Sequence, residues 1–307
     1  MIAAQYITLS ELQRRVRQVL EERFALPLWV SAEIAEVKVN YSGHCYLELV
    51  EKGEGDGVPK AQARAVIWRS QYARIAAYFE AETGQRLAAG MRILAKATVN
   101  YHELYGFSLQ LLDVDPAYTL GDMERQRQQT IARLQAEGVW EMNRQQAMPA
   151  VVQCIAVVSS SRAAGYQDFC NELAKSPYRF CLTLFDAVVQ GAAAEDSIVD
   201  ALSRIAAAGE AFDAVVMIRG GGSSSDLNCF NAYRLCNHVA QFPLPVVTGI
   251  GHDKDTSVAD LVAHTALKTP TAVAAWLVER MAQADGYLAW AGLQLGNAAL
   301  AITHSAA

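Results

Sequence analysis

The sequence has few cysteines and no long apolar run. Its 307 residues include six cysteines, too few for a disulfide scaffold in a chain of this length, and no two have the C-x-x-C spacing of a zinc site. No stretch of about 18 residues is free of charged or polar side chains, and the N-terminus lacks the pattern of a signal peptide. We therefore expect a reduced, cytoplasmic protein without a membrane span.

The chain also lacks an excess of positive charge. With 26 Lys+Arg against 32 Asp+Glu its net charge is -6, which disfavours the wrapping of duplex DNA but is compatible with a local basic groove. Residues 1–110 carry 13 basic and 12 acidic side chains, whereas the remainder carries 13 and 20. A hydrophobic content of 52% is ample for a core, and the length predicts two domains.

Hydrophobic alternation predicts a five-stranded barrel in the first part of the chain. A short helix that begins near Thr8 or Ser10 comes first, and a helical stretch at about 70–81 separates the third strand from the fourth. That order is typical of an OB-fold, a common platform for single-stranded nucleic acid. The predicted strands are residues 28–40, 44–52, 61–69, 91–102 and 106–116.

Aromatic and basic residues interleave along this predicted barrel. Such a mixture stacks bases and contacts phosphates, although half of the aromatic side chains could equally belong to the core. The candidates for binding DNA are Lys38, Tyr46, Arg64, Trp68 and Arg69.

The second part of the chain predicts an α/β fold. The polar stretch from Thr119 to Gln146 predicts a helix between the domains. The apolar runs that follow do not alternate and are separated by helical stretches, as is typical of buried parallel strands. These runs are residues 151–160, 180–189, 213–220 and 244–251.

These patterns together predict an α+β multidomain protein. Its parts are an OB-fold β-barrel at 1–117, a helical linker at 118–149, an α/β domain with a mainly parallel sheet at 150–270, and a C-terminal helix at 271–307.

A glycine run closes the third of the parallel strands and opens a helix. Arg219, Gly220, Gly221, Gly222 and Ser223 would bring free backbone N–H groups and a guanidinium to one point, which favours phosphate binding. The run has neither the lysine ending of a P-loop nor the spacing of a dinucleotide-binding loop. The alternative is a tight turn that needs glycine for its backbone angles.

An imidazole follows the fourth strand. His252 is a candidate general base or nucleophile, and Asp255 is better spaced than Asp253 to orient it, although a lone histidine in a loop is more often a bystander. Asp168, predicted to start the helix after the first strand, lies at the same sheet edge, where an acid also stabilises a helix terminus. Separated ligands without recognisable spacing make a weak metal site, and we predict none.

Taken together, these residues resemble the large subunit of exodeoxyribonuclease VII. The resemblance rests on three motifs in order: R-G-G-G-S-x-x-D-L-x-x-F-N from Arg219, G-x-G-H-x-x-D-x-x-x-A-D from Gly249, and T-P-T-A from Thr269. Three linked motifs behind an OB-like domain are far more specific than any one of them, and the resemblance covers nearly the whole chain.

The resemblance implies a nuclease that degrades single-stranded DNA from both ends into oligonucleotides. It implies a complex with several copies of a small helical subunit, and chemistry in which a divalent metal is at most stimulatory. Carried over position by position, it implies that Asp168, Arg219, His252 and Asp255 are catalytic.

The sequence departs from the family at two places. Asp253-Lys254 stands where the family usually has Glu-Thr, and the family continues past Thr271 into a long helical region that recruits small subunits. We expect residues 271–307 to be the start of that region, truncated, or else a short variant of it. The competing interpretations are a non-catalytic single-stranded DNA-binding protein and a nucleotide- or sugar-phosphate-binding enzyme, and the second leaves the barrel unexplained.

Overall fold

The computed structural model describes residues 6–53, 58–191, 193–208, 212–220, 224–251 and 256–305. The chain divides into two units, residues 1–125 and 126–307. Helix α3 (Pro116–Ala136) contributes residues to both.

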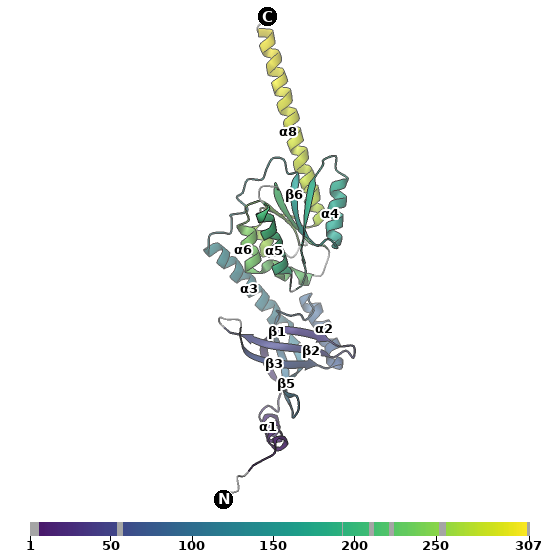
Figure 1. Ribbon diagram of the computed structural model, residues 1–307, viewed down its shortest axis with the longest axis vertical. Coiled ribbons are helices and arrows are strands. Elements are labelled where there is room, and N and C mark those ends of the chain that lie inside the picture. Colours follow the sequence, from purple (N-terminus) through teal and green to yellow (C-terminus); the bar gives the residue numbers. More distant parts are fainter. Residues whose placement is uncertain are drawn as a thin grey trace. The chain divides into compact units, whose positions relative to one another are not determined.

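Alternating apolar side chains close the first unit into a five-stranded barrel (Figure 1). The strands follow one another around it in the order β1-β2-β3-β5-β4; β3 and β5 pair in parallel and the other pairs are antiparallel. Each strand begins and ends within two residues of its predicted bounds, and the OB-fold prediction is confirmed. The strands are β1 (Leu28–Val39), β2 (Cys45–Lys52), β3 (Pro59–Ile67), β4 (Arg92–His102) and β5 (Gly106–Asp115).

The barrel core comes from the inward residues of all five strands. Ile34, Ile67, Ile93 and Leu111 are fully buried within it. Helix α2 (Arg69–Thr83), which connects β3 to β4, adds Ile75 and Phe79 to the same cluster. The period-two pattern thus places one side of each strand in the core and leaves the other side available for ligands.

Helix α1 (Leu9–Arg23) begins where the sequence predicts. Thr8 is its N-cap, and the Thr8 hydroxyl accepts a hydrogen bond from the backbone N–H of Glu11 at 3.2 Å. In α1, all of whose residues are described, no side chain is buried. The helix is held to the turn between β4 and β5 by Arg17, which donates to Glu103 at 3.4 Å.

The second unit contains a five-stranded parallel sheet in the order β10-β9-β8-β6-β7. All four predicted strands are present, each shorter than its apolar run, and the α/β prediction is confirmed. Strand β10 (Thr265–Ala266) is an addition, because two residues are too few to produce a hydrophobic pattern. The predicted strands are β6 (Cys154–Ser159), β7 (Cys181–Asp186), β8 (Ala214–Ile218) and β9 (Val246–Gly249).

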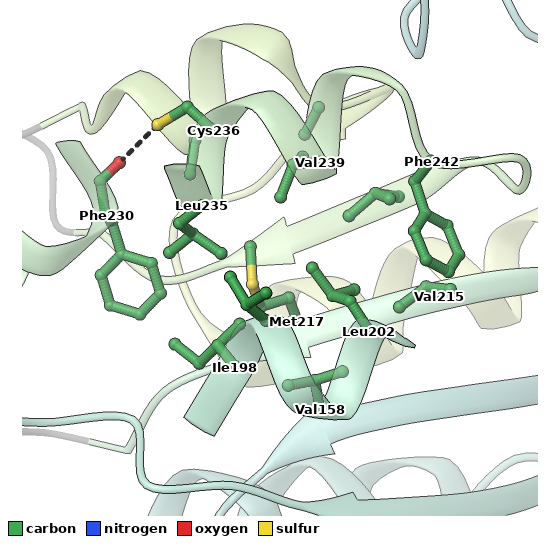
Figure 2. Packing of buried hydrophobic residues seen from close by; sticks show 14 of the residues in the cluster. Val158, Ile198, Leu202, Val215, Met217, Phe230, Leu235, Cys236, Val239 and Phe242 are labelled. Atoms are coloured by element: carbon green, nitrogen blue, oxygen red, sulfur yellow. Dashed lines mark hydrogen bonds between the residues drawn. The ribbon is translucent and has the colours of Figure 1, made fainter. Parts of the chain in front are cut away.

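Helices cover both faces of this sheet, which explains why its strands do not alternate. One face packs against α5 (Ala194–Ala207), α6 (Tyr233–Ala240) and α7 (Val258–Val262). Figure 2 shows part of that core, in which the Cys236 thiol donates to the carbonyl oxygen of Phe230 at 3.3 Å. Helices α4 (Ala164–Ala174) and α8 (Pro270–Ser305) pack against the other face (Figure 1).

The polar stretch after the barrel is helical only in its first part. Helix α3 ends at Ala136, and Gly138 follows with a φ of +72°, so the prediction of one helix to Gln146 is wrong. Past this point Asn143 is fully buried. Its Nδ2 donates to the carbonyl oxygens of Phe242 (3.1 Å) and Leu244 (2.9 Å).

The same Asn143 side chain also accepts two hydrogen bonds. Its Oδ1 receives the backbone N–H groups of Val246 (2.9 Å) and His264 (3.0 Å). These residues begin β9 and precede β10, and Asn143 therefore ties the amino-terminal ends of both strands together.

The first turns of α8 are buried against the sheet through Val273, Ala274 and Leu277. Farther along, the apolar residues Tyr287, Trp290 and Leu293 are exposed. Among the described residues, none of the helices combines the length and the apolar character that crossing a bilayer requires.

Candidate functional site

The candidate site lies at the carboxyl ends of three neighbouring parallel strands. Strands β6, β8 and β9 are adjacent in the sheet, and their carboxyl ends lead into the segments that begin at Ser160, Arg219 and Ile250. Because parallel strands end at the same edge, the segments that follow them meet there.

The segments after β6 and β8 are in close contact. A Cβ atom on Gly165, in the first turn of α4, would lie 2.7 Å from the Cα of Gly220 and 2.8 Å from the carbonyl oxygen of Arg219. It would also lie 3.0 Å from Pro270, at the start of α8. Only glycine allows α4 to begin this close to the Arg219–Gly220 backbone.

The end of β9 joins the same contact region. A Cβ atom on Gly249 would lie 2.7 Å from the Val273 side chain and 3.1 Å from the carbonyl oxygen of Thr269. The Thr269 hydroxyl accepts from the N–H of Ala272 at 3.1 Å, which caps α8, and the Arg219 N–H donates to the Gly249 carbonyl oxygen at 3.4 Å. All three sequence motifs therefore meet at this edge.

Two of the predicted catalytic residues are described. Arg219 is buried, with 5% of its surface exposed, directly after β8. Asp168 is exposed in the second turn of α4, which begins at Ala164; the prediction that Asp168 starts the helix is wrong, because the chain becomes helical sooner. It lies three residues after Gly165 and hence on a neighbouring part of the helix surface.

Gly220 is described and buried, whereas five of the predicted site residues lie outside the described residues. These are Gly221, Gly222, Ser223, His252 and Asp255. Within the described parts of the chain no three His, Cys, Asp or Glu side chains gather in a metal-binding group.

A further carboxylate stands at this edge, at the end of β7. Asp186 Oδ1 accepts from the backbone N–H of Ser161 at 2.7 Å, and it thereby fixes the start of the segment between β6 and α4. This hydrogen bond, together with the positive charges of Arg162 and Arg204, lowers the pKa of Asp186. The available sequence signal for it was a lone acid within the apolar run at 180–189.

On the barrel, four of the five DNA-binding candidates lie around the end of the β1–β2 hairpin. Lys38 and Tyr46 are directly opposite each other on β1 and β2, and both are exposed. Trp68 follows β3 and makes an edge-on contact with His44, with ring centroids 5.0 Å apart. The Arg69 N–H donates to His44 Nδ1 at 3.1 Å, so this histidine supports the start of α2.

The fifth candidate, Arg64, is exposed and lies farther along β3. It is opposite Glu48 of β2, and Gln62 donates a hydrogen bond to that glutamate. The residue opposite Arg64 is therefore an acid, whereas the residue opposite Lys38 is the aromatic Tyr46.

The comparison with known proteins identifies the family. The family model described as exonuclease VII, large subunit, matches residues 139–306, and the model for an OB-fold nucleic acid binding domain matches residues 7–115. The chain belongs to the exonuclease VII large-subunit family. The resemblance stated from the three motifs is thereby confirmed.

Individual family members are similar over most of this chain. The exodeoxyribonuclease 7 large subunit of Deinococcus radiodurans is 38% identical over 291 residues, which cover 91% of this chain and 69% of that protein. The proteins of the same name from Xanthomonas euvesicatoria pv. vesicatoria and Rhodopirellula baltica are 33% and 32% identical, over 89% and 86% of this chain. The chain spans 58% and 56% of their lengths.

Several motif residues outside the predicted catalytic set make buried contacts or hydrogen bonds beside the candidate site. Phe230 is fully buried in the core between the sheet and α6 (Figure 2). Asn231 Oδ1 accepts from the backbone N–H of Val258 at 2.9 Å, which joins the end of the first motif to the second. Asp260 is also buried, and its hydrogen bonds join the end of the second motif to Ser257 within it and to Thr248, the residue just before it. Sequence reasoning noted these residues only as motif positions.

Proposed function

We propose that this chain is the large subunit of a nuclease that hydrolyses phosphodiester bonds in single-stranded DNA. The observation that carries the proposal is the convergence of Gly165, Arg219–Gly220, Gly249 and Thr269 at one edge of the sheet, in a member of the exonuclease VII large-subunit family. The OB-fold barrel, which precedes the α/β unit in the sequence, supports a single strand as the substrate.

In the proposed reaction His252 acts at the scissile phosphate and Asp255 orients its ring. His252 either takes a proton from a water molecule that attacks phosphorus, or attacks phosphorus itself and is released by water in a second step. In both routes the bond from phosphorus to the leaving ester oxygen breaks, the water oxygen ends on phosphorus, and the leaving oxygen receives a proton.

Arg219 and the backbone N–H groups of Gly220, Gly221, Gly222 and Ser223 would bind the phosphate and stabilise the charge that grows on its oxygens. The burial of Arg219 supports this role, because a guanidinium shielded from water interacts more strongly with an anion. Asp168, exposed near the same edge, would assist positioning or proton transfer. We propose that this set works without a required divalent metal, which would be stimulatory at most.

The barrel would hold the strand through stacking on Tyr46 and Trp68 and through phosphate contacts from Lys38, Arg64 and Arg69. All five side chains are exposed. Recognition of backbone and base faces, without base-specific hydrogen bonds, is compatible with degradation from both ends into oligonucleotides.

We further propose that the chain works in the cytoplasm with a small subunit. The relatives' own names, which include the words large subunit, support this partner. Helix α8 supports it as well, since its outer part exposes a series of large apolar side chains. These are Tyr287, Leu288, Trp290, Leu293 and Leu295.

The test is digestion of single-stranded DNA labelled at either end, with and without EDTA and with and without the small subunit. The proposal predicts shortened products from both labels that persist in EDTA, and no comparable digestion of duplex DNA. Tight binding of the strand without any shortening would instead favour a non-catalytic single-stranded DNA-binding protein.

A further inference from the structure

A buried carboxylate joins the two ends of the segment that carries His252 and Asp255. Asp260 is 6% exposed, and Thr248 and Ser257, its partners, are 0% and 2% exposed. Asp260 Oδ1 accepts from the Thr248 hydroxyl at 2.6 Å, and Oδ2 accepts from the Ser257 hydroxyl at 2.7 Å and the Ser257 N–H at 3.0 Å. The two partners directly flank residues 249–256, Thr248 before the segment and Ser257 after it.

The two partners of Asp260 belong to different elements, the strand β9 and the helix α7. Thr248 belongs to β9, whose last residue is Gly249, and Ser257 is the N-cap of α7, where the chain becomes helical again. The Asp260 N–H donates back to the Ser257 hydroxyl at 3.2 Å, which completes a capping box. A capping box alone needs only Ser257 and Asp260, whereas the bond to Thr248 extends the contact across to the sheet.

A second hydrogen bond ties the glycine-run segment to the same helix. Asn231, at the end of the 3-10 helix η1 (Ser224–Asn231), accepts from the Val258 N–H at 2.9 Å. Two of the three segments that carry predicted catalytic residues, those of Arg219 and of His252 and Asp255, are therefore bonded at their ends to the first turn of α7. A shift of that turn would move the ends of both segments together.

We propose that Asp260 is a positioning residue for the nuclease site. It acts through Thr248 and Ser257 to hold the ends of the 249–256 segment at a fixed separation, and thereby sets the approach of His252 and Asp255 to the phosphate. The inference rests on the proposed function. Asp260 itself takes no part in bond making or proton transfer.

Three variants test this role. Asp260→Asn removes the charge and replaces one acceptor oxygen by an amide N–H₂: toward Ser257 this group meets a backbone N–H that can only donate, and toward Thr248 it forces the hydroxyl to turn and accept. Thr248→Val keeps the shape of the side chain, removes only the bond to the sheet and leaves the capping box intact. Thr248→Ser restores the hydroxyl and serves as the conservative rescue.

The matched control is Asn143→Ala. Asn143 is as buried as Thr248 and makes four hydrogen bonds, but it ties the amino-terminal ends of β9 and β10, at the opposite end of the sheet from the candidate site. It therefore reports what a loss of buried hydrogen bonds does to stability without a change at the site.

For each variant we would measure Tm, the oligonucleotide Kd, and kcat and KM for cleavage of a single-stranded oligonucleotide with the small subunit present. The kinetic and binding measurements are made at a temperature well below the lowest Tm of the set. We expect kcat to fall about 100-fold in Asp260→Asn and about 10-fold in Thr248→Val, as small displacements of reacting groups do. KM and Kd should stay within about 2-fold because most contacts to the strand come from the barrel, which these variants do not touch. Thr248→Ser should recover most of the lost rate, and Asn143→Ala should lower Tm with an unchanged kcat.

Two results would overturn the inference, and they are distinguishable. If the wild-type chain does not cleave, the proposed function fails and this inference fails with it. If the wild type cleaves and Thr248→Val or Asp260→Asn keeps the wild-type kcat while only Tm falls, Asp260 is a purely structural residue and the proposed function stands.

Discussion

Gly165 packs against Gly220 so closely that a Cβ atom on Gly165 would stand 2.7 Å from the Gly220 Cα. The two residues lie in different segments, one after β6 and one after β8, and the close approach sets the spacing between α4 and the glycine run. The contact is with backbone, which cannot rotate away as the end of a flexible side chain could.

Gly165→Ala should therefore displace the Arg219–Gly220 backbone. We expect a loss of about 1–3 kcal/mol in the free energy of unfolding and a drop of at least about 10-fold in cleavage rate. The control is Gly286→Ala in α8, where the added methyl would have no atom within 4 Å apart from the adjacent residues and helix backbone, and where the higher helix propensity of Ala should raise the free energy of unfolding by about 0.5–1 kcal/mol. Equal rates for Gly165→Ala and wild type would contradict the role of this contact.

Trp68→Ala should weaken binding of a single-stranded oligonucleotide by about 5-fold to 150-fold, because each base stacked on an aromatic ring contributes about 1–3 kcal/mol. Fluorescence anisotropy gives the Kd. Trp68→Phe keeps a stacking surface and should bind nearly as the wild type does. Unchanged affinity in Trp68→Ala would remove this ring from the DNA-binding surface.

Lys38 and Arg69 should each contact a phosphate. Replacing either by Ala should reduce the steepness of log Kd against log salt by about 0.7 for a single strand, since one counterion-release site is lost. Arg86→Ala, which removes a guanidinium paired with Glu80 on α2, is the control and should leave the slope as it is. A slope that stays constant in Lys38→Ala and Arg69→Ala means that other cations bind the strand.

The lowered pKa of Asp186 predicts a pH-dependent contribution to stability. The carboxylate is favoured in the folded state by the Ser161 N–H, so its contribution is fully present above its ordinary pKa of 3.8 and is lost as the pH falls through the lower folded value. The stability difference between wild type and Asp186→Asn should therefore be constant near neutral pH and shrink below about pH 4. Urea unfolding at several pH values measures it, and a difference that does not vary with pH would contradict the assignment.

Much of the fold follows from the sequence because its patterns are local. Alternation identifies the barrel strands within two residues of their ends, and unalternating apolar runs identify the buried parallel strands. Helix α3 is shorter than its polar pattern indicates because Gly138 ends it. The residues that follow are fixed instead by Asn143, whose hydrogen-bond partners lie about a hundred positions away in the sequence and leave no local pattern.

Local sequence patterns predict less of the candidate site than of the fold. The gathering of Arg219, Gly220 and Gly249 at one edge could be predicted, because parallel strands place their carboxyl ends together. The contact of Gly165 with Gly220 and the bond of Thr248 to Asp260 could not, since each depends on side-chain directions between separate elements. Asp168 was assigned to the correct helix but one turn too early.

The most direct test of the proposed nuclease activity compares the wild-type chain with His252→Ala on end-labelled single-stranded DNA in EDTA, with the small subunit present. We expect His252→Ala to abolish shortening of the strand while its oligonucleotide Kd stays equal to that of the wild type. A His252→Ala protein that cleaves at the wild-type rate would contradict it.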